Sequence, residues 1–187
     1  MKKRCDWVNL KNDLYVKYHD EEWGVPLHDE NKLFEALILD GAQAGLSWEM
    51  ILNKRENYRK AYDNFDPKKV AKYSEEKILD LLEDAGIVRN RLKVRSSVKN
   101  AKVFLEIQKE FGSFDKYLWN FVDGKPVKNK LEKLEDFPAK TDLSDKISKD
   151  LKKRGMSFVG STIIYAMMQA IGMVNDHQVG CFRYDQV

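Results

Sequence analysis

Residues that bind soft metal ions are scarce in this chain. The 187 residues include only two cysteines and three histidines. No CxxC pair and no HExxH motif occurs, because His19 is followed by Asp-Glu-Glu-Trp. These absences disfavour a hydrolytic zinc enzyme, which normally carries its ligands and its general base in such a motif.

Long apolar stretches are also missing. No segment has the length and hydrophobicity needed to span a membrane. The chain starts with Met1-Lys2-Lys3-Arg4 and a polar stretch, without the apolar core of a signal peptide. We therefore expect a cytoplasmic protein with no membrane partner, whose thiols stay reduced.

A strong excess of charge of one sign is absent as well. The formal net charge is +3, and 34% of the residues are charged. This balance does not by itself indicate a nucleic-acid binder, since mixed charges usually solvate a surface. Local clusters are more informative: basic residues recur at every second position from Arg89 to Arg95, and Lys152-Lys153-Arg154 precedes a glycine. Both clusters are candidate phosphate contacts.

Four of the five cysteines and histidines form two pairs near opposite ends of the chain. His177 and Cys181 are four residues apart, so that on one helical turn they would share a face. Cys5 and His19 are separated by a loop-sized gap. Together they predict a tetrahedral Cys2His2 zinc site that joins the termini and is structural, because no coordination position stays open. Two unrelated buried thiols with surface histidines, or a Cys5–Cys181 disulfide, are the alternatives.

The hydrophobic pattern predicts an all-α fold. Amphipathic periodicity with polar caps recurs along the chain, and sustained two-residue alternation is absent. The predicted helices cover about residues 30–40, 75–84, 90–111, 114–122, 143–154 and 161–172, and two more begin after Ser47 and at Asp66-Pro67. We expect Gly41 to end or bend the first helix, and the lysine-rich residues 123–142 to be the one long connection. With 43% hydrophobic residues, the chain can bury one core or two small lobes that share a cleft.

A helix, a glycine-flanked turn and a second helix follow one another at about residues 143–172. In several folds this arrangement brings backbone N–H groups to a DNA phosphate at a helix N-terminus. A plain helical hairpin is the alternative. The candidate phosphate contacts in this segment are Lys153, Arg154, Gly155, Gly160, Ser161 and Thr162.

Aromatic residues gather near the N-terminus. Three of the four tryptophans and two tyrosines lie within the first 48 residues: Trp7, Tyr15, Tyr18, Trp23 and Trp48. Core packing is the ordinary role of such rings. Trp23 and Trp48, however, adjoin glycine-containing turns, where rings can line a cleft for a flat ligand. Asp40 is the carboxylate best placed to join them.

Three segments have a distinctive sequence: Tyr18-His-Asp-Glu-Glu-Trp-Gly-Val-Pro26, Gln43-Ala-Gly-Leu-Ser-Trp48 and Asn175-Asp-His-Gln-Val-Gly-Cys181. Together with residues 54–58, 85–89 and 152–162, they resemble the DNA-3-methyladenine glycosylase I family. The resemblance covers essentially the whole chain. It implies one catalytic domain over residues 1–187, with a helix-hairpin-helix glycosylase fold of two lobes around a base-binding cleft. It also implies a structural zinc ion bound by Cys5, His19, His177 and Cys181.

The activity that this resemblance implies is base-excision repair of alkylated double-stranded DNA. Such an enzyme hydrolyses the N-glycosidic bond of 3-methyladenine and leaves an abasic site, after turning the base out of the stack. The resemblance assigns catalysis to Asp40 and Tyr18, and base binding to Trp48 with Trp7, Tyr15 and Trp23 as walls. Gln43, Gly45 and Leu46 would fill the gap left in the DNA. At the position of Asp40 the family carries glutamate, which is one methylene longer.

No motif places a lysine as a Schiff-base nucleophile, so we expect a monofunctional enzyme. For the oligomeric state, a monomer is the default expectation. A zinc-stabilised module that binds damaged DNA without cleaving a bond, and a zinc hydrolase, are the rival functions.

Overall fold

The computed structural model describes residues 2–187. Met1, the first residue of the polar start noted above, lies outside the described residues. The chain is mostly helical, as predicted. The α-helices are α1 (Asp13–Glu21), α2 (Glu30–Gln43), α3 (Trp48–Ala61), α4 (Pro67–Val70), α5 (Glu75–Glu83), α6 (Arg91–Phe111), α7 (Phe114–Trp119), α8 (Asp142–Lys153) and α9 (Ser161–Ala170). Short 3-10 turns are η1 (Asp63–Phe65), η2 (Asn120–Val122) and η3 (Leu134–Asp136), and two strands are β1 (Val127–Lys128) and β2 (Val174–Asn175). Across residues 2–187, every helix is too short or too polar to cross a bilayer.

Helix starts are set by local capping. The side chains of Asp29, Ser47 and Ser74 accept hydrogen bonds from backbone N–H groups of the first turns of α2, α3 and α5. Asp66 caps α4 in the same way, just before Pro67. Each cap satisfies a donor that the helix itself leaves free. The helix starts predicted from these residues are therefore confirmed.

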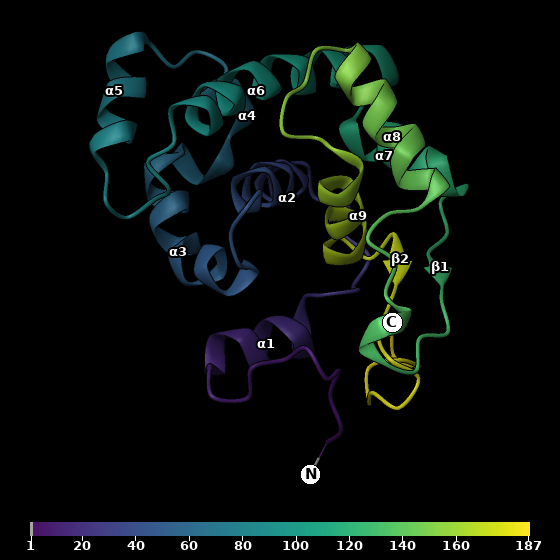
Figure 1. Cartoon of the computed structure of the whole chain (residues 1–187). Helices are drawn as coiled ribbons and strands as arrows, with labels where there is room; N and C mark the ends of the chain where they lie inside the picture. Colours follow the sequence, from purple (N-terminus) through teal and green to yellow (C-terminus); the bar gives the residue numbers. More distant parts are fainter. Residues whose placement is uncertain (1) are drawn as a thin grey trace.

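Helix α2 forms the centre of the molecule, with α9 beside it and α6 across one end, while α1 lies toward the other end (Figure 1). The inner face of α2 is buried: Leu33, Phe34, Leu37 and Ile38. On α6 the buried apolar residues include Val94, Ala101, Phe104 and Ile107, whereas Leu105 is half-buried.

Gly41 does not end α2, which was one of the two roles predicted for it. The helix continues to Gln43, and Gly41 is buried inside it. A Cβ added to Gly41 would lie 3.4 Å from both the Cβ and the carbonyl oxygen of Phe158, in the turn between α8 and α9. Gly41 thus permits this turn to approach α2 closely. The last helix also ends earlier than predicted, at Ala170.

Three features near the termini were not predicted. Helix α1, which Asn12 caps, covers residues that we assigned to no element. Strands β1 and β2 pair in parallel, with Val127 opposite Val174, and an isolated bridge between Leu131 and Gln178 follows (Figure 1). Part of the predicted connection at residues 123–142 is therefore attached to the C-terminal segment. Sequence periodicity did not reveal this pairing, because the two strands have only two residues each.

The end of α9 packs against the loop that follows α1. Gly24 N–H donates to the Gln169 carbonyl, and Leu27 N–H donates to the Ile171 carbonyl, each at 3.0 Å. A Cβ on Gly172 would lie 2.4 Å from the carbonyl carbon of Val25. Gly172 is therefore required both for its positive φ of 70° and for this close contact.

We predict that Gly172→Ala destabilises the protein much more than Gly45→Ala. Both glycines have a positive φ, but nothing lies within 4 Å of a Cβ added to Gly45. Gly45→Ala should therefore cost only the left-handed strain of about 1 kcal/mol, whereas Gly172→Ala adds a backbone clash and should cost roughly 3 kcal/mol or more. Urea unfolding of the two variants measures both values. Equal losses would show that the contact with Val25 carries no free energy.

Candidate functional site

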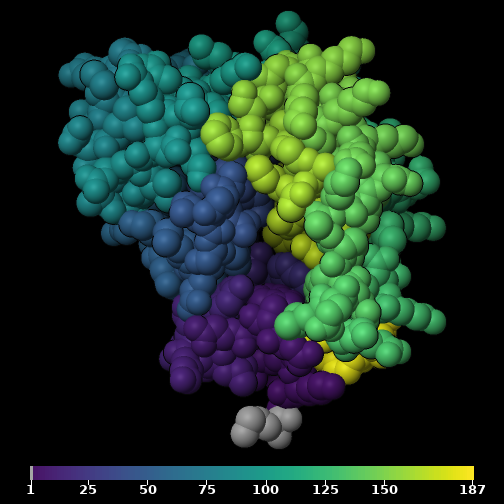
Figure 2. Space-filling model, in the orientation of Figure 1, coloured from purple at the N-terminus to yellow at the C-terminus, as the bar shows by residue number. Residues whose placement is uncertain are grey.

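A cavity of about 320 Å³ lies between the N-terminal segment, α1, α2, α3, α9 and the η3 region. Figure 2 shows the recess between the purple and blue N-terminal part and the green segment that precedes α8. The structure brings together in its wall the six residues predicted for catalysis and base binding, Trp7, Tyr15, Tyr18, Trp23, Asp40 and Trp48, and also Gln43, which was predicted to fill the gap left in the DNA. Four residues complete the wall: Leu134, Phe137, Ala166 and Gln169.

Local structure explains how the aromatic residues reach this cavity. Tyr15 and Tyr18 are three residues apart on α1 and so share a helix face. Trp48 is the first residue of α3, immediately after its cap. The ring centroids of Tyr18 and Trp48 are 5.3 Å apart, and those of Trp7 and Trp23 are 4.8 Å apart. The cavity is thus walled by rings that support one another at ordinary aromatic distances.

Three buried polar atoms in this wall have no hydrogen-bond partner among the described residues. They are the indole nitrogens of Trp7 and Trp48 and one carboxylate oxygen of Asp40. An unsatisfied buried donor or acceptor costs about 1–3 kcal/mol, so such atoms are rare without a function. Two donors and one acceptor around one cavity match a flat ligand that carries both kinds of group.

Asp40 is buried inside α2, and no cation among residues 2–187 pairs with it. Burial raises the pKa of the Asp40 carboxyl well above its usual range. Burial also raises the pKa of Tyr18, and the charge of Asp40 adds to this effect. A positively charged ligand would relieve the uncompensated charge of an ionised Asp40, while the rings would stack on its faces. The site can therefore hold a flat, cationic heterocycle.

A second, larger hollow of about 580 Å³ touches Tyr18, Asp40 and Trp48 as well. Its outer wall carries charged groups that already pair with one another. Arg55 donates to both carboxylate oxygens of Glu22, at 2.6 and 2.9 Å. The smaller cavity, with its unpaired donors, is therefore the better candidate for the site.

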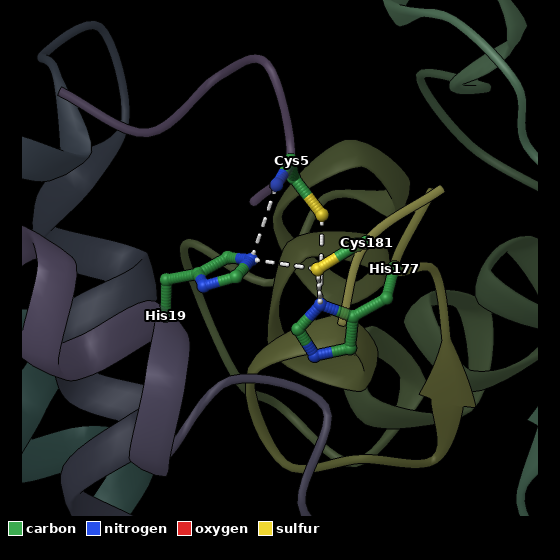
Figure 3. Close-up of side chains that lie close together, drawn as sticks. All are labelled: Cys5, His19, His177 and Cys181. Carbon is green, nitrogen blue, oxygen red and sulfur yellow. Dashed lines mark hydrogen bonds between the residues drawn. The ribbon is translucent and has the colours of Figure 1, made fainter. Parts of the chain in front are cut away.

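The four predicted metal ligands converge in one buried cluster. The candidate ligand atoms of Cys5, His19, His177 and Cys181 all lie within 4.8 Å of one another. Cys5 Sγ is 3.5 Å from His177 Nδ1, and Cys181 Sγ is 3.4 Å from His19 Nε2. Figure 3 shows the four side chains pointing toward one another from the N-terminal segment, from α1 and from the C-terminal segment. This cluster can hold a metal ion.

The surrounding hydrogen bonds orient the two histidines for metal binding. Asp20 Oδ1 lies 2.8 Å from His19 Nδ1, and the Trp23 carbonyl lies 3.0 Å from His177 Nε2. Both partners are acceptors, so each ring donates outward and turns its other, unprotonated nitrogen toward the two sulfurs. Arg4 in turn holds Asp20 with two hydrogen bonds of 2.8 and 2.7 Å. The donor set and its tautomers fit a four-coordinate soft-metal site.

Both sulfur atoms also accept a hydrogen bond from the backbone. The backbone N–H groups of Gln178 and Arg183 donate to Cys5 and Cys181, respectively, each at 3.4 Å. Interaction with Cys5 lowers the pKa of Cys181. A thiolate is the form of cysteine that binds a metal ion. The helical turn predicted for His177 and Cys181 is wrong, however: a tight turn closed by Cys181 N–H and the Gln178 carbonyl, at 2.7 Å, brings the two together.

The residues predicted to contact DNA lie in two places. Gly45 is exposed and Leu46 half-buried in the turn between α2 and α3, and Gln43 lines the cavity nearby. Lys93, one of the basic residues at positions 89–95, is half-buried, and its ammonium is engaged within the fold. It donates to the carbonyls of Ala42 and Ala44 at 2.7 and 2.6 Å, and so supports this turn.

The second place is the hairpin between α8 and α9. Lys153 and Thr162 are exposed, and Gly155 has a φ of +104°. Gly160 is the residue that precedes α9. Arg154 and Ser161 are engaged within the fold: Arg154 pairs with Asp150 and Glu110, and the Ser161 hydroxyl lies 2.8 Å from that of Ser144. Their predicted DNA contacts stay predictions.

Sequence reasoning missed four residues in the cavity wall. Leu134 and Phe137 come from the stretch that we interpreted as a connection, and Ala166 and Gln169 come from α9. No local pattern marks the first two, because their position depends on the pairing of residues 127–131 with the C-terminal segment.

Comparisons with known proteins agree with this geometry. The family model described as methyladenine glycosylase matches residues 7–184. DNA-3-methyladenine glycosylase 1 of Escherichia coli is 48% identical over 97% of both chains, and DNA-3-methyladenine glycosylase of Haemophilus influenzae is 46% identical over 97% of both. A crystal structure of 3-methyladenine DNA glycosylase I superposes with a TM-score of 0.93 at 48% identity, covering 96% of this chain and 98% of that one. The enzyme from Staphylococcus aureus, solved for the structural basis of 3-methyladenine recognition, gives a TM-score of 0.90 at 38% identity over 92% of each chain.

We predict that Asp40→Asn stabilises the free protein at neutral pH. The raised pKa of Asp40 means that folding opposes its ionisation, so the parent loses stability as pH rises above the ordinary carboxyl pKa of 3.8. The Asp40→Asn variant buries no charge at this position, so its stability does not fall for this reason as the pH rises. The unfolding free energies of the parent and the variant, measured from pH 3.5 to pH 8, should nearly coincide at pH 3.5. As the pH rises, the unfolding free energy of the variant should exceed that of the parent by an increasing amount. A parent that gains stability relative to the variant over this interval would contradict the burial effect.

Proposed function

The chain belongs to the methyladenine glycosylase family, and on that basis we propose that it excises 3-methyladenine from alkylated double-stranded DNA as a step of base-excision repair. The reaction is hydrolysis: water replaces the base at C1′ of the deoxyribose, the free base is released, and an abasic site remains. The observation that carries this proposal is the aromatic cavity with the buried, unpaired Asp40 in its wall. Its volume is in the range of small-ligand sites, and a base inside duplex DNA must leave the stack to reach it.

Methylation at N3 supplies most of the chemical activation. It places positive charge on the base, which then leaves as a neutral molecule, so strong general-acid catalysis is unnecessary. The protein has to evert the nucleotide, stack the base and stabilise the positive charge that develops on the sugar as the bond breaks. Only interactions that strengthen toward this transition state raise the rate.

The residues of the cavity divide these tasks. Trp48, with Trp7, Tyr15 and Trp23, provides the ring faces, on which a cationic base stacks favourably. Asp40 accepts from the exocyclic amine of the purine and contributes negative charge near the reacting bond. Because aspartate is shorter than the glutamate of the family, a water molecule can bridge this contact. Tyr18, buried beside Asp40, positions the base with its hydroxyl.

The turn between α2 and α3 and the hairpin between α8 and α9 are proposed to hold the DNA. Gln43, Gly45 and Leu46 fill the space that the everted nucleotide leaves. The helix-hairpin-helix at residues 143–172 binds a phosphate through Lys153, Arg154, Gly155, Gly160, Ser161 and Thr162. Exposure of Lys153 and Thr162 and the left-handed backbone of Gly155 support this assignment. Residues 1–187 act as one catalytic domain, and as a monomer.

The Cys2His2 cluster is proposed to hold a structural zinc ion, with Cys5, His19, His177 and Cys181 as ligands. Two sulfurs and two oriented imidazole nitrogens fill a tetrahedral shell, which leaves no position for a water nucleophile. When bound, zinc supplies a cross-link between the two ends of the chain rather than a reactive group. The base cavity is separate from this cluster and carries the chemistry.

We predict that Trp48→Ala slows release of 3-methyladenine from methylated DNA roughly 10- to 100-fold, because base stacking is worth about 1–3 kcal/mol. Tyr18→Phe should slow it about tenfold, since it removes one hydrogen bond. Tyr73→Phe is the control, because the Tyr73 hydroxyl bonds Asp63, away from the cavity. Chromatography of the released base gives the rates. Unchanged turnover in both cavity variants would refute the assignment, and binding of damaged DNA without any release by the parent would indicate a binding module.

We predict that Cys5→Ser and His19→Gln each lose zinc and stability together, since each breaks a four-ligand set. His28→Gln is the matched control: His28 is the one histidine outside the cluster and pairs with Asp115. Elemental analysis and thermal unfolding provide the two measurements. Full metal content in the Cys5 variant would contradict the proposed site. A stably folded, metal-depleted protein with no turnover would favour a zinc hydrolase instead.

A further inference from the structure

Leu134 and Phe137 close one side of the base cavity from a weakly held segment. Leu134 belongs to η3 and is 45% exposed, although it lines the cavity. Within residues 132–139 the hydrogen bonds are mostly local: Asp136 accepts from the N–H groups of Glu132 and Lys133 at 2.9 and 3.0 Å. These bonds shape the turn, but they do not fix it to the rest of the molecule.

One side chain ties this segment to the fold. Gln178 Nε2 donates to the Glu132 carbonyl at 3.0 Å. Among the described residues, this is the only hydrogen bond that joins residues 132–139 to another part of the chain. Just before the segment, Val179 N–H donates to the Leu131 carbonyl at 2.8 Å. Hydrogen bonds from Gln178 and Val179 therefore attach residues 131–137 to the C-terminal segment.

The same amide also holds the N-terminal segment. Gln178 Nε2 donates to Asp6 Oδ2 at 2.8 Å, and Gln178 Oε1 accepts from Asp6 N–H at 2.6 Å. Asp6 is followed by Trp7, which lines the cavity from the N-terminal segment. Gln178 is only 4% exposed, so its amide makes these bonds without competition from water. Two walls of the cavity thus meet at one buried side chain.

We propose that Gln178 is a positioning residue for the base cavity: its amide holds residues 132–137 against the N-terminal segment and so sets where Leu134 and Phe137 lie beside the base. The inference rests on the proposed function only in naming the ligand. The contacts of the Gln178 amide with Glu132 and Asp6 do not depend on that function. The Gln178 amide makes the one hydrogen bond that, among the described residues, joins residues 132–139 to another part of the chain, so its loss should reduce the order of this wall. An ordered wall binds a ligand without first being fixed in place.

The decisive variant is Gln178→Met, which keeps the volume of the side chain and removes its hydrogen bonds. Gln178→Glu is the second: it still accepts from Asp6 N–H but places an oxygen against the Glu132 carbonyl. Gln186→Met is the matched control, because Gln186 is an exposed glutamine of the same C-terminal segment and contacts Arg183. All are studied as the full chain, with metal content measured first.

Two readouts test the proposal. Tryptophan fluorescence titration with free 3-methyladenine should show an affinity about tenfold weaker in both Gln178 variants, the equivalent of one or two lost hydrogen bonds. Hydrogen–deuterium exchange should be faster at residues 132–137, whereas the Gln186 variant should match the parent in both. Adding Leu134→Ala to Gln178→Met should weaken binding by less than the sum of the single effects, because both changes act on the same wall.

Several outcomes would overturn the positioning role. These are unchanged base affinity, faster exchange without weaker binding, additive effects with Leu134→Ala, or loss of metal in both Gln178 variants, which would assign the amide to the metal cluster. Failure of the proposed function looks different. In that case the parent itself releases no base and gives no fluorescence change with 3-methyladenine, while the exchange measurement still reports whether Gln178 holds the wall.

Discussion

The convergence of four buried donors from both ends of the chain is the constraint on which the site depends. His19 lies on α1, the helix that also presents Tyr15 and Tyr18 to the cavity, so the position of these rings follows from the position of the cluster. The connection between the two is short. The Trp23 carbonyl is bonded by His177, while the Trp23 ring packs edge-on to Trp7 at 4.8 Å. The position of the cluster at one end of this ring system is therefore coupled to the geometry of the cavity at the other.

The cavity itself is built at the expense of stability. Within the part of the chain that the structure describes, three polar atoms of its wall have no hydrogen-bond partner, and the buried Asp40 has no charged partner. In a structural core such groups would be replaced by apolar ones, because each unpaired group opposes folding. Their presence together, around one cavity, is a physical reason to regard it as a site for a polar, cationic ligand. The large core around α2 and α6 supplies the compensating stability.

A second consequence concerns how the protein encloses its ligand. The cavity is assembled from the N-terminal segment, three helices of the first half of the chain, α9, and a turn that is attached through Gln178. Tyr18 on α1 and Trp48 on α3 belong to a packed hydrophobic cluster. Among the described residues, the turn at residues 132–137 has a single hydrogen bond to the rest of the chain, from Gln178, besides the packing of Phe137 against that cluster. The turn is therefore the side of the site where base affinity can be adjusted without changing the core.

Local chemistry explains what the sequence determined by itself. Helix starts at Asp29, Ser47 and Ser74 follow from side chains that cap the adjacent N–H groups, and the motifs around Trp23, Trp48 and His177 indicated the family before any coordinates. The tertiary structure alone decided what depends on distant partners. Gly41 lies inside α2, where Phe158 of the turn between α8 and α9 approaches it closely. His177 and Cys181 meet through a turn rather than a helix, and Leu134 reaches the cavity because Leu131 pairs with Gln178. Capping involves residues that are neighbours in the sequence, so it can be predicted from the sequence alone. The other contacts join distant segments that come together only when the chain folds.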